Sequence, residues 1–226
     1  MATPRHPWWR RPLRWGVALA LAPVAAGLTW ALVDVAWAPR NRLEAWVPLA
    51  CGALIWTVVF LMLPKPMWLY VVGHELTHAL WTWAFGGRVS GFKATAKGGH
   101  VIVSKSNAFI VLAPYFFPLY TVLWGGAFMV VNWALGWHGQ EFWLRLGIGL
   151  TYAFHVTLTA HVLRNRQPDI DGEGWVFSAV WVWLMHVLLL LVALPAVTGS
   201  MAPVEALARA GRRIAQVAVG LARLAF

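Results

Sequence analysis

Long apolar runs separated by short polar segments dominate the sequence and predict a bundle of membrane-spanning helices. An α-helix needs about 20 apolar residues to cross a bilayer, and six segments meet or approach this length. They are Trp15–Val33, Ala45–Pro64, Pro66–Gly87, Ser106–Trp137, Phe142–Leu163 and Gly174–Gly199. The fourth is longer than one span, and we expect its Pro114 and Pro118 to kink it. The pattern therefore predicts an all-α integral membrane fold with about six transmembrane helices.

Two polar linkers interrupt the apolar pattern. In Arg88–Lys105, the stretches Phe92–Ala96 and His100–Lys105 can pair as a short β-hairpin across Lys97-Gly98-Gly99, because alternating residues flank a glycine-containing turn. The other linker, Arg164–Gly174, holds three of the eight acidic residues of the chain. Polar side chains from these two segments can therefore reach the helix bundle.

The last segment, residues 201–226, follows a transmembrane core assigned to residues 1–200 and predicts a basic amphipathic helix. At 100° per residue, arginine and glutamine side chains gather on one arc and aliphatic side chains on the other. The polar arc holds Arg209, Arg212, Arg213, Gln216 and Arg223, and the apolar arc holds Leu207, Ile214, Val217, Leu221 and Leu224. Such a helix can lie on a membrane surface, and the alternative is a helix packed on the bundle.

Composition agrees with an integral membrane protein. Hydrophobic residues make up 60% of the chain and charged residues only 12%, about half the charged share of a soluble domain. The net charge of +10 could indicate nucleic acid, but the arginines cluster at the termini and between apolar runs, which favours attraction to a membrane surface. We therefore expect a multi-pass membrane protein without a nucleic-acid partner, in which Asp34 pairs with an arginine at a helix end. The short termini, rich in arginine and proline, favour a bacterial inner membrane.

The third apolar segment contains the sequence Gly73-His74-Glu75-Leu76-Thr77-His78-Ala79-Leu80. Residues four apart on a helix lie about 40° apart, so His74 and His78 face the same way and can bind one metal ion. Glu75 lies beside them, placed to take a proton from water at the metal. This is the H-E-x-x-H pattern of zinc hydrolases, in which zinc lowers the pKa of its water to about 7.

A chance match to this short motif is the alternative. Against it, ionisable side chains in mid-membrane cost about 2.5–3.5 kcal/mol each on insertion scales. The single cysteine, Cys51, excludes a thiolate cluster and an internal disulfide. The sequence therefore favours a metal site built from imidazole and carboxylate groups.

A catalytic zinc site usually has three protein ligands, so a third must come from elsewhere in the chain. Asp169 and Asp171 are the leading candidates, because they directly precede the last apolar run. His155 is a rival ligand, and it could instead hydrogen-bond a substrate carbonyl or a neighbouring helix. His100, in the predicted turn, is a weaker candidate ligand. With Asn107, His155 and His100 are the candidate substrate-binding residues.

These motifs together resemble the site-2 protease family of intramembrane zinc metalloproteases, over roughly residues 66–180. The residues that carry the resemblance are His74-Glu75-Leu76-Thr77-His78, Phe85-Gly86-Gly87-Arg88-Val89, Gly98-Gly99-His100 and the later Asn165 to Gly172. The resemblance implies that His74 and His78 bind zinc and that Glu75 is the catalytic acid and base. It also implies a membrane-associated hairpin after the catalytic helix, where Arg88–Lys105 lies.

The third ligand in the family is an aspartate in an N-P-x-P-x-x-x-L-D-G pattern, from which this chain departs. Asn165 and Pro168 keep their spacing, but only two residues separate Pro168 from Asp171-Gly172, where the pattern has four. Asp169 follows the proline directly and is the favoured ligand, with Asp171 as the alternative. The chain also lacks the PDZ-type domain of many relatives, which makes it a minimal member.

The resemblance implies cleavage of a peptide bond within or near the transmembrane segment of a single-span membrane protein, as in regulated intramembrane proteolysis. The shortened aspartate motif motivates an alternative, a catalytically inactive relative that binds membrane helices as a regulator or chaperone. A metal transporter is a third hypothesis. The i, i+4 histidine pair with its adjacent glutamate is better suited to holding a metal than to passing it on.

Overall fold

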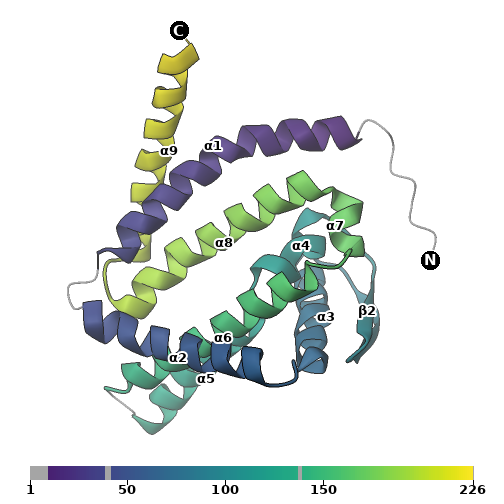
Figure 1. Cartoon of the computed structure of the whole chain (residues 1–226), viewed down its shortest axis with the longest axis vertical. Helices are drawn as coiled ribbons and strands as arrows, with labels where there is room; N and C mark the ends of the chain where they lie inside the picture. The colour runs from purple at the N-terminus through teal and green to yellow at the C-terminus, as the bar shows by residue number, and fades with distance from the viewer. Residues whose placement is uncertain (1–9, 39–41, 137–138, 226) are drawn as a thin grey trace. The chain divides into compact units, whose positions relative to one another are not determined.

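The computed structural model describes residues 10–38, 42–136 and 139–225, and these are mostly helical (Figure 1). The helices are α1 (Arg10–Ala36), α2 (Arg42–Met62), α3 (Met67–Ala84), α4 (Ala108–Phe116), α5 (Leu119–Leu135), α6 (Glu141–Val162), α7 (Pro168–Glu173), α8 (Trp175–Thr198) and α9 (Pro203–Ala225). Two strands, β1 (Val89–Thr95) and β2 (Gly98–Val103), lie between α3 and α4. The chain forms two compact units, Met1–Arg42 with Arg166–Phe226, and Leu43–Asn165.

The first unit contains α1, α7, α8 and α9 around an aliphatic core. Its buried residues are Ala25, Leu28, Ala31, Val35, Leu184, Val187, Leu191, Ala206 and Ala210. Small alanines let the helices approach closely, and Gly27 has the same effect, because a Cβ there would lie 2.7 Å from the backbone of Ile214 in α9. The predicted pairing of Asp34 is confirmed: Arg213 donates two hydrogen bonds to its carboxylate, at 2.7 and 3.0 Å.

The tail forms the predicted helix, α9, which crosses α1 (Figure 1). Its first half packs in the core of the first unit through Ala206 and Ala210, whose side chains are 0% and 3% exposed. Its second half leaves Val219, Leu221 and Leu224 exposed. Packing therefore accounts for the first half of α9, and a membrane-surface role for the apolar second half stays a prediction.

The segment predicted as a polar linker, Arg164–Gly174, is partly helical. Residues Pro168–Glu173 form α7, with Pro168 in the first turn, where its missing N–H costs nothing. Arg14 of α1 donates to the Gly172 carbonyl at 2.6 Å and forms an ion pair with Glu173 at 2.6 Å. These contacts fix the end of α7 within the first unit.

The second unit contains α2 to α6 and the hairpin. Its core is aromatic: Trp56, Tyr70 and Phe154 pack with Leu158, and Trp56 Nε1 donates to Thr157 Oγ1 at 2.8 Å. The fourth apolar run breaks before Pro118, so that α4 and α5 meet at 73°. This confirms the predicted kink; the predicted end of that run, Trp137, lies outside the described residues.

The hairpin is confirmed and longer than predicted. β1 and β2 pair antiparallel, with Lys93 opposite His100 and Thr95 opposite Gly98. β1 begins at Val89, and its register is irregular between Val89 and Gly91. The turn is therefore formed by Ala96 and Lys97 rather than by Lys97-Gly98-Gly99. Gly98 has φ of 139°, a conformation that favours glycine.

Within the part of the chain that the structure describes, three helical segments are long and apolar enough to cross a membrane: Pro12–Ala36, Leu43–Met62 and Trp175–Thr198. The bent pair α4 and α5 can count as a fourth. Helices α3 and α6, with 18 and 22 residues, are not among these long apolar segments. Both carry ionisable residues in their interiors, among them those that define the candidate site below.

Candidate metal centre

The histidine and glutamate residues of the motif lie on α3, in the second unit. The helix begins directly after Pro66 and ends at Ala84, with Phe85 as its C-cap. Beyond it, Gly86 adopts φ of 68° and Gly87 N–H donates to the Thr82 carbonyl. Threonine hydroxyls on this helix also donate to carbonyls one turn earlier, as Thr77 does to Gly73 at 2.7 Å. These bonds satisfy polar groups within the helix, so that its buried face can carry the motif.

His74 and His78 stack one turn apart, with ring centroids 4.9 Å apart and ring planes at 78°. His78 and Glu75 are buried, at 8% and 7% exposure, whereas His74 is half-buried. The structure therefore brings the two imidazoles together as the i, i+4 spacing predicts.

A backbone carbonyl of α4 orients His78. The Nδ1 of His78 lies 2.8 Å from the carbonyl oxygen of Ile110. Because a carbonyl oxygen only accepts hydrogen bonds, Nδ1 carries the proton in this contact, and Nε2 is the nitrogen of the neutral ring that can coordinate a metal. Hydrogen bonds of this kind, from the second ring nitrogen of a ligand histidine, fix ring orientation and raise ligand basicity.

Pro114 explains why the Ile110 carbonyl can serve this purpose. In an α-helix the carbonyl of residue 110 would accept a hydrogen bond from the N–H of residue 114. Proline has no N–H, and its ring is pushed against the carbonyl four residues earlier. Asn107 binds the amide of the same residue, because its Oδ1 accepts a hydrogen bond from Ile110 N at 2.9 Å. The first turn of α4 thus presents one carbonyl to His78.

The hairpin covers Glu75. A Cβ at Gly99 of β2 would lie 2.7 Å from Cγ of Glu75 and 2.9 Å from Cγ1 of Val71. Real Cβ atoms essentially never come so close, so only glycine allows the strand to approach α3 here. The glutamate therefore lies between its own helix and the strand β2.

A small cavity of about 20 Å³ lies beside the histidine pair. It is lined by His74, Thr77, Tyr70 and, from α6, His155, and its volume is close to what one water molecule needs. Tyr120 lines the same space and donates to the Leu69 carbonyl at 2.6 Å. A Cβ at Gly73 would lie 2.6 Å from the Tyr120 ring, so the glycine before His74 makes room for that ring.

The other predicted site residues fall in different places. His155 is 7% exposed and lines the same cavity as His74; its role as a metal ligand or substrate-binding residue stays a prediction. His100 is exposed on β2, opposite Lys93. Asn107 is also exposed, and its side chain caps α4; a contact of either residue with substrate stays a prediction.

Asp169 and Asp171 lie on α7, in the first unit, so their role as third ligand also stays a prediction.

Sequence reasoning did not identify the Ile110 carbonyl or the approach of Gly99 to Glu75. A proline four residues after Ile110 was the available signal for the first. The second has no local signal, because it depends on how the hairpin packs against α3. Comparison with known protein families, curated proteins and solved structures finds no match to this chain.

Proposed function

We propose that the protein is an intramembrane zinc metalloprotease that hydrolyses a peptide bond within or near a transmembrane segment of a single-span membrane protein. The observation that carries this proposal is the arrangement on α3. Two imidazoles one turn apart flank a buried glutamate, and one of them is oriented by a backbone carbonyl at 2.8 Å. A purely structural polar network would not need this combination.

The donor set suits zinc, since imidazole nitrogen is among its preferred ligands. His74 and His78 would hold the ion, and we propose Asp169 as the third ligand, with Asp171 or His155 as alternatives. When bound, zinc supplies a Lewis acid that makes water a nucleophile at neutral pH. The fit rests on the two histidines and on the orientation of His78.

Glu75 is the residue that would move the proton. Its carboxylate lies one residue from His74 on the same helix, where it can accept a proton from the attacking water and then donate it to the leaving amine. Burial between α3 and β2 keeps bulk water away from this exchange. His155, beside the cavity, can donate to the carbonyl of the bond that is cut.

A substrate helix must unwind before cleavage, because its amides are internally bonded in lipid. The hairpin packed next to Glu75 offers strand edges with which an unwound segment can pair; His100 and Asn107 lie on or just after it. In this proposal α3 and α6 also cross the membrane, giving about six spans in a bacterial inner membrane. The polar groups of these two helices then face the site rather than lipid.

The test compares Glu75→Gln with the parent protein in detergent or reconstituted vesicles, using a panel of single-span reporter helices. Zinc content should stay at about one ion per chain, while cleavage falls by a factor of about 10² to 10⁴. Glu141→Gln, the same change at an exposed position of α6, serves as the control and should cleave normally. Undiminished cleavage by Glu75→Gln would refute the mechanism.

A parent protein that holds zinc, cleaves no reporter and binds membrane helices equally well with Glu75→Gln would favour the inactive helix-binding relative. The third ligand is assigned by zinc content in Asp169→Ala and Asp171→Ala. We expect loss of zinc only in Asp169→Ala. Loss only in Asp171→Ala would transfer the role to that residue, and retention in both would favour His155.

A further inference from the structure

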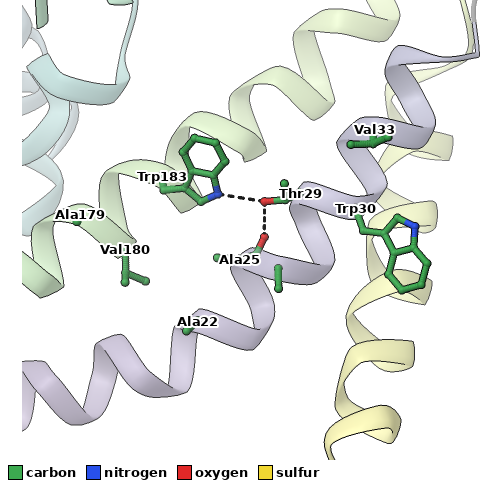
Figure 2. Close-up of a pocket in the computed structure, with 9 residues that line it drawn as sticks. Ala22, Ala25, Thr29, Trp30, Val33, Ala179, Val180 and Trp183 are labelled. Carbon is green, nitrogen blue, oxygen red and sulfur yellow. Dashed lines mark hydrogen bonds between the residues drawn. The ribbon is translucent and has the colours of Figure 1, made fainter. Parts of the chain in front are cut away.

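The first unit contains an apolar groove along α1 and α8, two helices long and apolar enough to span a membrane (Figure 2). Its volume is about 680 Å³. Small side chains leave the space, among them Ala22, Ala26 and Ala179, while Trp30 and Trp183 line it as larger groups. Trp183 Nε1 donates to Thr29 Oγ1 at 3.0 Å, which ties α8 to α1 beside the groove (Figure 2).

A polar cavity of about 740 Å³ follows at the C-terminal end of α1. It is lined by Asp34, Trp37, Arg209, Arg212, Arg213 and Gln216. Two carboxylates compensate part of its positive charge: Arg213 pairs with Asp34 and Arg209 with Glu205, both at 2.7 Å. Three guanidinium groups against two carboxylates leave one net positive charge, and Arg212 is the exposed arginine outside these two ion pairs.

The two spaces adjoin through one stacked pair. Trp30 lines the apolar groove, and the guanidinium carbon of Arg213, which lines the polar cavity, lies 4.1 Å from the Trp30 ring centroid. Along α1 the lining passes directly from Val33 to Asp34. The surface is therefore apolar along α1 and basic near its C-terminal end. The exposed Trp37 lies at this end, and tryptophan is typical of the membrane interface.

We propose that the groove and the polar cavity together bind one anionic phospholipid with a single phosphodiester charge. An acyl chain occupies the groove beside Ala26, and the phosphate accepts hydrogen bonds from Arg212, since Arg213 already donates to Asp34 and Gln216. Charge complementarity selects this occupant, because the cavity has one net positive charge and arginine forks match phosphate oxygens. A transmembrane helix of a partner would fill the groove but would leave the arginines without an anion.

The experiment titrates the full chain in detergent with dioleoyl phosphatidylglycerol, dioleoyl phosphatidylcholine and inorganic phosphate, and counts bound molecules by native mass spectrometry. We expect retention of one phosphatidylglycerol and weaker binding of phosphatidylcholine, which has the same chains. Arg212→Gln should weaken phosphatidylglycerol binding about fivefold, the effect of about one basic side chain at a membrane surface. Arg223→Gln removes the same charge from the same helix outside the cavity and should leave binding unchanged.

A second variant tests the groove without touching charge. Ala26→Phe fills the apolar space from an exposed position and should lower phosphatidylglycerol binding, whereas Leu19→Phe, elsewhere on the exposed surface of α1, should not. Equal binding of the two lipids, or binding that neither Arg212→Gln nor Ala26→Phe weakens, would overturn the proposal. Phosphate binding that depends on Arg212 but not on Ala26, without preferred lipid retention, would show an anion site only and overturn the lipid assignment.

Discussion

The two units of this protein bury different chemistry. Among the described residues, the buried polar side chains of the second unit are Glu75, Thr77, His78, Thr82, His155 and Thr159, whereas those of the first are Ser178 and Thr198. The core of the first unit is aliphatic, and its ion pairs lie outside that core, as Asp34 near the end of α1 does with Arg213. The second unit places His74, Glu75 and His78 in the interior of α3 and His155 in the interior of α6.

The first unit packs its helices around a core of alanine, leucine and valine side chains, and its ion pairs, such as Asp34 with Arg213, lie outside this core. The second unit instead buries histidine and glutamate side chains, and burying such groups in a membrane costs free energy. Two neighbouring elements contact the motif on α3. The Ile110 carbonyl of α4 orients His78, and the hairpin covers Glu75. This difference supports the proposal that the second unit holds the metal centre.

Removal of one histidine should produce the largest difference in zinc content between variants of the two units. We expect His78→Ala to lose bound zinc, because a catalytic site with two remaining ligands holds the ion weakly. His186→Ala removes a histidine from α8 of the first unit and should keep about one zinc per chain. Metal analysis of the purified proteins measures both. Equal zinc content in the two variants would mean that the second unit is not the metal-binding one.

Pro114→Ala tests whether the Ile110 carbonyl orients the ligand. The new N–H at residue 114 can donate to that carbonyl in competition with His78, and loss of such support lowers metal affinity about 10–100-fold. Pro23→Ala in α1 also removes a helix proline and should leave zinc affinity unchanged. Competition with a zinc chelator gives the affinities. An unchanged affinity in Pro114→Ala, with the fold retained, would show that the carbonyl has no such role.

Gly73→Ala tests the close packing around the site. The added methyl group meets the Tyr120 ring at 2.6 Å, and overpacking of this kind costs about 1–3 kcal/mol. Gly126→Ala in α5 is the matched control, since nothing lies within 4 Å of its Cβ position, and alanine there should be neutral or stabilising. Unfolding in detergent compares the two. A Gly73→Ala protein as stable as Gly126→Ala would contradict the packing described here.

Thr29→Val, in the first unit, should have the smallest effect on stability of these variants and should not affect the metal centre. It removes the oxygen that accepts from Trp183 Nε1, an interhelical bond worth about 0.6 kcal/mol in a membrane. Thr57→Val removes a hydroxyl that bonds within its own helix, to Ala53, and should cost less. Zinc content should stay unchanged in both. A loss of zinc in Thr29→Val would show that the units do not separate packing from chemistry.

The sequence predicted those elements whose signals are local. The hairpin, the break before Pro118 and the basic C-terminal helix followed from glycine, proline and arginine at short spacing. Pairing of Asp34 with an arginine also followed, although the partner, Arg213, was not named because it lies 179 residues away. The sequence predicts a linker where the short helix α7 lies, because a six-residue acidic segment has too few apolar positions to show a helical period.

By itself, then, the sequence determined the apolar helices and the motif His74-Glu75-Leu76-Thr77-His78, because helical periodicity alone places residues four apart on one face. Only the tertiary structure decided what surrounds that motif. The carbonyl of Ile110 reaches His78 from another helix, and Gly99 approaches Glu75 from a strand that packs on α3. A backbone carbonyl has no sequence identity, and a close approach depends on the packing of distant segments, so neither can be read from local spacing.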